Sequence, residues 1–195
     1  MKQIVLIRHG KTEGNLTRKY IGRTDEPLCK EGREELALSI REGIYPLRME
    51  DSVLLVSPMK RCRETAAMIY PGADQHVIED FRECDFGAFE YKNHKELNGN
   101  PDYQAWIDSG GQMKFPQGED PDDFRERSIG AFLRLFQDYG DSPQLLLVVH
   151  GGTIMSLMSG LAEPSAGYFE NCVDNGHGFV CEAAGDGRMK LVRQI

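Results

Sequence analysis

Four residues of this chain share two properties: each closely follows an apolar run, and each can bind or attack a phosphate group. They are Arg8, His9, Arg61 and His150. A guanidinium offers forked donors that match phosphate oxygens, and a neutral imidazole can attack phosphorus to give a phosphohistidine. Neighbouring cations keep a histidine neutral, while a second, protonated histidine would stabilise charge on the phosphoryl oxygens. Either histidine alone would more often be an ordinary residue at the end of a strand, but the two together favour a phosphoryl-transfer site.

Three short apolar runs must position these side chains. Residues 4–7, 53–56 and 145–149 consist of Val, Leu and Ile, which is typical of buried strands. In open α/β sheets, ligands bind at the carboxyl ends of the strands. Because the polar groups follow the carboxyl end of all three runs, we expect them to form one site.

The apolar spacing between the strands predicts helices. Their expected ranges are 30–47, 58–70, 122–139 and 152–161. Ser57 is expected to cap the second helix, with Pro58 as its first residue. Residues 179–181 and 189–192 are expected to form a closing hairpin. The alternation of strands and helices predicts an α/β fold, a three-layer sandwich with a mostly parallel central sheet and helices on both faces.

The stretch from about 85 to 122 differs in composition from the rest of the chain. Gly, Asn, Pro and Asp are frequent there, aromatic residues are interspersed, and only short helices are expected, near 93–97 and 102–108. We expect an excursion over the site rather than a second domain, so that residues 1–195 form a single domain. The aromatic residues are expected to form a small core of their own rather than to contact substrate.

Composition argues against several classes of partner. The net charge of −8 disfavours nucleic acid or an anionic membrane. The first residues carry too few apolar side chains for a signal peptide. The five cysteines contain no CxxC pair, so we expect reduced thiols and a cytoplasmic location. The sequence leaves the oligomeric state open, a homodimer included.

Other phosphate and metal chemistries fail on spacing. A nucleotide-binding P-loop ending at Gly10-Lys11-Thr12 would need glycine at position 5, which is Val5. No cysteine is followed by arginine six residues later, as a cysteine phosphatase requires, and no GxGxxG follows a strand. HExxH, aspartate ladders and Cys/His quartets are also absent, so neither a metal nor a cofactor is expected.

The order and spacing of six segments resemble those of one known family, the phosphoglycerate mutase-like branch of the histidine phosphatase superfamily. The first segment, residues 8–15 (RHGKTEGN), is similar to the family signature RHGxTxxN. The others are 22–28 (GRTDEPL), 57–66 (SPMKRCRETA), 82–87 (RECDFG), 116–119 (PQGE) and 149–152 (VHGG). Cys29 and Asp120 stand where the family usually has threonine and serine, and both changes fall in loops. The resemblance implies a phosphoglycerate mutase-like fold.

The resemblance also implies roles for individual residues. His9 would be the nucleophile. Glu83, which by itself would be interpreted as a solvated carboxylate, would protonate the leaving oxygen and then activate water. Arg8, Arg61 and His150 would hold the phosphoryl group. The resemblance adds four substrate-binding positions, namely Asn15, Ile21, Gly22 and Gly151. It implies no metal and no cofactor.

The family includes both phosphatases and mutases. Mutases typically carry an arginine-rich segment after the acid, whereas here Glu83 is followed by Cys84-Asp85-Phe86 and few cations. We therefore expect a metal-independent phosphomonoesterase that hydrolyses a small phosphorylated metabolite through a phosphohistidine, closest in pattern to α-ribazole phosphatase-like and broad small-molecule phosphatases. Phosphoglycerate mutase-type phosphoryl transfer is the alternative, and a non-catalytic phospholigand-binding protein is an alternative of another class. The sequence does not identify the physiological substrate.

Overall fold

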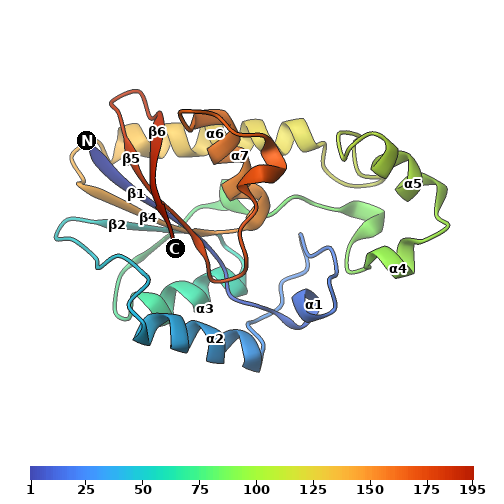
Figure 1. Ribbon diagram of the computed structural model, residues 1–195, viewed down its shortest axis with the longest axis horizontal. Coiled ribbons are helices and arrows are strands. Elements are labelled where there is room, and N and C mark those ends of the chain that lie inside the picture. Colours follow the sequence, from blue (N-terminus) through green and yellow to red (C-terminus); the bar gives the residue numbers. More distant parts are fainter.

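The computed structural model describes residues 1–195, which form one six-stranded sheet with helices on both faces (Figure 1). The strands are β1 Lys2–Arg8, β2 Val53–Val56, β3 Gln75–Val77, β4 Gln144–Val149, β5 Gly178–Ala183 and β6 Met189–Gln194. The α-helices are α1 Glu13–Leu16, α2 Lys30–Arg41, α3 Lys60–Ile69, α4 His94–Leu97, α5 Pro101–Asp108, α6 Pro121–Asp138 and α7 Gly151–Leu161. The chain contains no helix that is both long and apolar enough to cross a membrane.

The sheet has a parallel half and an antiparallel end. Its strands lie in the order β3-β2-β4-β1-β5-β6. The β1–β4, β4–β2 and β2–β3 pairs are parallel, whereas β5 pairs antiparallel with both β1 and β6. All six residues of β4 are buried, as expected for a parallel strand that is covered on both faces. The predicted mostly parallel sheet and the predicted hairpin are confirmed.

Two apolar cores lie on opposite faces of this sheet. Leu6 packs in one core with Phe132 of α6 and the apolar side of α7. Val5, the preceding residue of β1, packs in the other core with Leu36 of α2 and Ala66 of α3. Successive side chains of a strand point to opposite faces, which explains this division. Figure 1 shows α6 and α7 on one side of the sheet and α2 and α3 on the other, so the predicted three-layer sandwich is confirmed.

The predicted C-terminal end of α2 is wrong. The helix ends at Arg41 and not at Leu47. Gly43 turns the chain with a φ of +66°, a conformation that helices do not contain and that glycine adopts readily. Leu47 is 89% exposed and belongs to neither core. The apolar residues that suggested a longer helix extend beyond Gly43, but the helix itself does not.

The predicted start of α3 is also wrong. The helix begins at Lys60, with Met59 at the N-cap position, instead of at Pro58 after a Ser57 cap. The Ser57 hydroxyl lies 2.7 Å from a ring nitrogen of His150 and is therefore engaged elsewhere. Arg61 nevertheless lies in the first turn of the helix, as predicted.

Residues 85–122 contain α4 and α5 and carry a third, smaller apolar core. Its buried members are Cys84, Phe89, Leu97, Tyr103, Phe115 and Phe124. The aromatic rings meet mostly edge to face, as for Phe89 on Tyr103 at a centroid distance of 5.3 Å and an angle of 90°. This core holds the segment against the start of α6, beyond the carboxyl ends of the parallel strands (Figure 1).

Candidate active site

The two histidines that were predicted to share a site lie side by side. Arg8 at the end of β1 pairs with Val149 at the end of β4. His9 and His150 directly follow these two paired residues. Their imidazole centroids are 5.2 Å apart, and the ring planes are inclined at 67°. His9 is 4% exposed and His150 is fully buried. The register of one strand pair thus brings the two rings together.

His9 is held as a single tautomer. Its Nδ1 lies 2.7 Å from the carbonyl oxygen of Gly10. Because a carbonyl oxygen only accepts hydrogen bonds, Nδ1 carries the proton and Nε2 keeps its lone pair. Burial, and then the positive charges of Arg61 and Arg8, hold the pKa of His9 well below its usual range. This neutral ring with a free Nε2 lone pair is the form that can attack phosphorus.

Arg8 and Arg61 place positive charge beside the histidines. A terminal nitrogen of Arg8 donates to the carbonyl of Val173 at 2.6 Å. Arg61 is fully buried, and its terminal nitrogens donate to backbone carbonyls. In both residues the Nε atom is shielded from solvent and has no hydrogen-bond partner. Buried donors without partners are costly, and an anionic oxygen is the acceptor that a guanidinium N–H binds best.

The side chain of Glu83 contacts the first turn of α7. Its Oε2 accepts the N–H of Gly152 at 3.3 Å, and its Oε1 accepts the N–H of Cys84 at 3.0 Å. Burial raises the pKa of the Glu83 carboxyl, while the Cys84 amide and Arg61 oppose this shift. A raised pKa favours the protonated carboxyl, which is the form that a general acid needs.

His150 is held from inside the protein. Its Nε2 lies 2.7 Å from Ser57 Oγ and 3.6 Å from the sulfur of Cys62. Burial, and then the charge of Arg61, hold the pKa of His150 well below its usual range. A phosphoryl group bound beside the ring would oppose this shift, because a nearby negative charge favours the protonated form.

Replacing Ser57 with alanine is expected to destabilise the protein. The change leaves the buried Nε2 of His150 without its hydroxyl partner, and a buried polar atom that loses its partner commonly costs about 1–3 kcal/mol. The free energy of unfolding in urea measures the loss. Ser52→Ala is the control, because the Ser52 hydroxyl binds only the exposed guanidinium of Arg48. Equal stability of the two variants would contradict a structural role for the Ser57–His150 hydrogen bond.

A cavity of about 310 Å³ opens at this end of the sheet. Of the predicted site residues, six line it: Arg8, His9, Asn15, Ile21, Glu83 and Gly151. The other three, Gly22, Arg61 and His150, are not among its lining residues. Gly22 contacts Arg61 through its carbonyl oxygen at 3.0 Å. The predicted residues therefore form one cluster, part of which faces the cavity and part of which supports it.

The remainder of the cavity wall includes seven aromatic residues. Its aromatic residues are Tyr20, Phe86, Trp106, Phe115, Phe124, Tyr168 and Phe169. Lys19 and Arg125 are the cations of this wall. Arg125 is already engaged, since its guanidinium lies 4.4 Å from the centroid of the Tyr168 ring and donates to Asp122 at 2.8 Å. The aromatic residues of the 85–122 segment thus both form a core and contribute to the cavity.

Several cavity residues have no signal in the sequence. Lys19, Met155, Arg125 and Tyr168 line the cavity from four separate parts of the chain. No single window of sequence holds them together, and none belongs to a recognisable motif. Met155 is the one that periodicity could have found, since it is half-buried in α7 between the residues that face the core.

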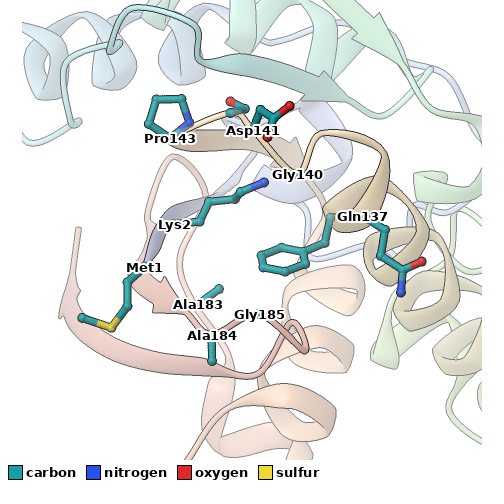
Figure 2. Close-up of a pocket in the computed structure, with 11 residues that line it drawn as sticks. Met1, Lys2, Gln137, Gly140, Asp141, Pro143, Ala183, Ala184 and Gly185 are labelled. Atoms are coloured by element: carbon teal, nitrogen blue, oxygen red, sulfur yellow. The ribbon is translucent and has the colours of Figure 1, made fainter.

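A second cavity lies at the opposite edge of the sheet, beside the amino end of β1. It measures about 430 Å³, and Lys2, Asp141 and the residues after β5 line it (Figure 2). Lys2 is the only cationic side chain in its wall, and the Lys2 amine donates to the carbonyl oxygen of Tyr139. With no imidazole and no guanidinium in its wall, this cavity lacks the groups for phosphoryl transfer.

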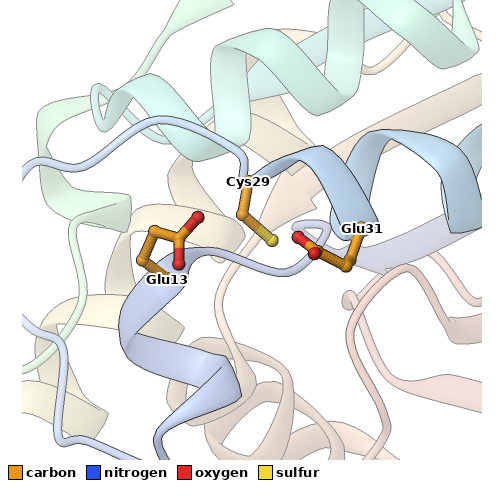
Figure 3. A group of neighbouring side chains, drawn as sticks. All are labelled: Glu13, Cys29 and Glu31. Carbon is orange, nitrogen blue, oxygen red and sulfur yellow. The ribbon is translucent and has the colours of Figure 1, made fainter.

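The side chains of Glu13, Cys29 and Glu31 also gather at one place, between α1 and the start of α2 (Figure 3). Their potential ligand atoms lie within 4.8 Å of one another. The Cys29 sulfur, however, already accepts the N–H of Gly32 and caps α2, and burial raises the pKa of its thiol. Both carboxylates are exposed. The group is therefore explained as a helix cap flanked by surface acids.

Comparison with known proteins identifies the family. A model of the histidine phosphatase superfamily (branch 1) matches residues 4–193. The adenosylcobalamin/alpha-ribazole phosphatase of Salmonella typhimurium is 29% identical over 179 residues, which cover 88% of this chain and 85% of that protein. The "probable phosphoglycerate mutase GpmB" of Cronobacter sakazakii is 31% identical over 170 residues, which cover 83% of this chain and 76% of that protein.

Solved structures show the same fold. The alpha-ribazole phosphatase from Shigella flexneri superposes with a TM-score of 0.82 at 23% identity, covering 97% of this chain and 94% of that one. A phosphoglycerate mutase from Thermus thermophilus superposes with a TM-score of 0.71 at 24% identity, covering 99% and 98%. With a family model that spans nearly every residue, this chain belongs to the histidine phosphatase superfamily, branch 1.

Proposed function

We propose that this protein is a metal-independent phosphomonoesterase that hydrolyses a small phosphorylated metabolite through a phosphohistidine at His9. The observation that carries the proposal is the tautomer of His9. Its Nδ1 is bound to the Gly10 carbonyl, so the Nε2 lone pair is free in a ring that borders the cavity. The charges of Arg61 and Arg8 act on this ring, and the half-buried Glu83 carboxyl lines the same cavity. These groups supply a nucleophile, charge stabilisation and a proton donor.

In the first step, His9 Nε2 attacks phosphorus and the ester P–O bond breaks. Glu83 gives its proton to the leaving oxygen, which departs as an alcohol. Arg8, Arg61 and His150 hold the phosphoryl group and stabilise the negative charge on its oxygens. Because the pKa of Glu83 is raised, its carboxyl holds the proton that this step needs. Because the pKa of His9 is lowered, the nucleophile stays neutral.

In the second step, water replaces the alcohol. The Glu83 carboxylate takes a proton from this water while the water oxygen attacks phosphorus, and the P–N bond to His9 breaks. Inorganic phosphate leaves, and both residues return to their starting forms. Asn15 is a further donor here: its Oδ1 accepts hydrogen bonds from Thr12 at 3.1 Å and Asn175 at 3.3 Å, which leaves its amide Nδ2 for a phosphoryl oxygen. The backbone N–H of Gly151, at the start of α7, is placed to assist.

The cavity wall supports hydrolysis of an ester whose alcohol carries an apolar or aromatic group. Seven aromatic side chains face the space beside the phosphoryl-binding residues. Beyond Arg8, the only cations in the cavity wall are Lys19 and Arg125, and Arg125 already binds Asp122. These two cations make a poor site for a second phosphate. The relative from Salmonella typhimurium is itself named a phosphatase. We therefore favour a phosphatase over a mutase.

The proposed function is tested with p-nitrophenyl phosphate in the presence of excess EDTA. Phosphate release is expected to proceed at the same rate with and without the chelator, because each role in the two steps falls to a side chain of this protein. Loss of turnover in EDTA, with recovery on adding back a divalent cation, would contradict a metal-independent reaction. Binding of inorganic phosphate without any turnover would instead indicate a non-catalytic binding protein.

The choice between phosphatase and mutase needs a second substrate. The protein is incubated with 3-phosphoglycerate and 2,3-bisphosphoglycerate, and both products are followed by phosphorus NMR. Slow release of inorganic phosphate without 2-phosphoglycerate is the expected result. Rapid formation of 2-phosphoglycerate without phosphate release would establish the mutase alternative, which the Cronobacter sakazakii relative represents.

We further propose a cytoplasmic location and a single-domain organisation for residues 1–195. All five cysteines are free, and four of them are buried. Thiols that stay unpaired are typical of a reducing compartment. Residues 85–122 would then act as one wall of the substrate site within the same domain, since Phe86, Trp106 and Phe115 all face the cavity.

A further inference from the structure

Arg61 is a fully buried cation whose terminal nitrogens bind one loop. They donate to the carbonyl oxygens of Ile21 at 3.3 Å, Gly22 at 3.0 Å and Thr24 at 2.8 Å. These acceptors are neutral peptide groups, and no carboxylate accepts a hydrogen bond from Arg61. The position of this guanidinium, and of its unpaired Nε, therefore depends on the conformation of residues 21–24.

Glu90 holds the same loop from its other side. Its Oε1 accepts the N–H of Gly22 and the N–H of Thr24, each at 2.9 Å. The peptide unit between Ile21 and Gly22 thus donates its N–H to Glu90 while its carbonyl accepts from Arg61. Hydrogen bonds at the two ends of one peptide group polarise and strengthen each other. A single peptide consequently links a carboxylate to the buried guanidinium.

The surroundings leave this loop little freedom. The backbone around Glu90 is tied to it, because Tyr91 N–H donates to the Tyr20 carbonyl at 2.8 Å and Tyr20 N–H donates to the Lys92 carbonyl at 3.0 Å. A Cβ atom on Gly22 would lie 1.9 Å from the carbonyl oxygen of Cys84, so only glycine allows this close approach. The loop that holds Arg61 is therefore also packed against the residue that follows Glu83.

The Glu90 carboxylate has no hydrogen-bond partner other than the two N–H groups of this loop. Its second oxygen, Oε2, is shielded from solvent and accepts no hydrogen bond. Two backbone N–H groups could be satisfied equally by a neutral glutamine, so hydrogen bonding alone does not require a carboxylate. A buried negative charge is costly unless a positive charge lies near it, and Arg61 is the buried cation directly across the loop.

We propose that Glu90 is a positioning residue that acts through residues 21–24 to fix the Arg61 guanidinium beside the phosphoryl site. Glu90 itself does not line the cavity and touches no reacting atom. It sets the directions of the carbonyl groups that hold Arg61, and its charge balances the guanidinium. The proposal rests on the proposed function only in taking Arg61 as a phosphoryl ligand.

The test compares two Glu90 variants with a matched control. Glu90→Ala removes the acceptor, whereas Glu90→Gln keeps an acceptor and removes the charge. Glu96→Ala is the control, because the Glu96 carboxylate also accepts a backbone N–H, that of Asn93 at 2.9 Å, but serves the exposed start of α4. Circular dichroism and thermal unfolding establish that each variant is folded, and Glu90→Gln keeps the test open if Glu90→Ala does not fold.

Three measurements are made on each folded variant. For Glu90→Ala, kcat/KM for p-nitrophenyl phosphate is expected to fall about 10- to 100-fold, the range in which loss of a supporting partner commonly weakens a site. The inhibition constant of inorganic phosphate is expected to rise in parallel, with Glu90→Gln between Glu90→Ala and the native protein. The control is expected to stay within about twofold of native values, as surface substitutions usually do.

The third measurement does not depend on turnover. Arg61 is one cause of the lowered pKa of His9, so a displaced guanidinium should let the pKa of His9 rise toward its usual range. An NMR titration of the His9 ring in native and variant proteins detects this shift. An unchanged His9 titration in folded Glu90→Ala would overturn the proposal. Absence of turnover in the native protein would overturn the proposed function instead, and the titration would still decide the role of Glu90.

Discussion

His9→Ala is expected to abolish phosphate release, lowering kcat by about 10⁴-fold or more, as removal of a covalent nucleophile does in other enzymes. The reason is that the first step transfers the phosphoryl group to His9 Nε2, and no other unprotonated nitrogen lines the cavity at this point. His150, the nearest ring, has its own Nε2 engaged by Ser57. The measurement is release of inorganic phosphate from p-nitrophenyl phosphate at saturating substrate.

The covalent intermediate gives a second readout for the same variant. Native protein that is quenched during turnover of a ³²P-labelled ester should carry label that is stable in alkali and lost in acid, as phosphohistidine is, and His9→Ala should carry none. His76→Ala is the control, because His76 is exposed on the edge strand β3 and its ring hydrogen-bonds only to Tyr139. Turnover by His9→Ala at the native rate would refute the assignment of the nucleophile.

Glu83→Gln is expected to lower kcat/KM by about 10²- to 10⁴-fold for esters of simple alcohols, the usual contribution of a general acid. A smaller effect is expected for p-nitrophenyl phosphate, because the p-nitrophenolate leaving group departs without a proton. Glutamine has nearly the same shape, but its single carbonyl oxygen can accept only one of the two backbone N–H groups that the Glu83 oxygens bind, so circular dichroism is used to establish that the variant is folded. Equal losses for both kinds of ester would argue against proton donation.

The pH dependence of hydrolysis of the esters of simple alcohols checks the direction of the pKa shifts of His9 and Glu83. The first step needs neutral His9 and protonated Glu83. The pKa of His9 is lowered, so the neutral ring persists to lower pH than usual, and the pKa of Glu83 is raised, so the protonated carboxyl persists to higher pH than usual. In the native protein, kcat/KM should rise with pH as His9 loses its proton and fall as Glu83 loses its proton. In Glu83→Gln the fall at higher pH should disappear. Substrate titration is common to both proteins, so the difference between their profiles isolates Glu83.

The strands and the arginine and histidine residues of the candidate site could be predicted from the sequence because their signals are local. Short runs of Val, Leu and Ile indicate buried strands, and the residues at the ends of parallel strands meet at one edge of the sheet. That reasoning placed His9 beside His150, and the 5.2 Å between their rings agrees with it. Arg61 could be predicted for a related reason, since it lies in the first turn of a helix that follows a parallel strand.

Glu83 and Glu90 could not be predicted from local patterns. Both lie in irregular chain after the short 3₁₀ helix Glu79–Phe81, where neither helical nor strand periodicity marks which side chains face inward. Family resemblance supplied the role of Glu83, and only the structure shows the contacts of Glu90 with the loop at residues 21–24. The cap position of Ser57 failed for a similar reason, because a tertiary contact with His150 replaced the local one.

The strand order of the sheet also governs when the protein becomes active during synthesis. β1 is made first, but both of its sheet neighbours, β4 and β5, come from the last third of the chain, and the paired residues Gln3 and Gln144 are separated by 141 positions. A nascent chain on the ribosome therefore carries His9, Arg61 and Glu83 long before it carries the strand that seats His150. Such distant pairing slows folding. The enzyme is expected to leave translation as an inert chain and to acquire its pocket only when the final strands close around β1.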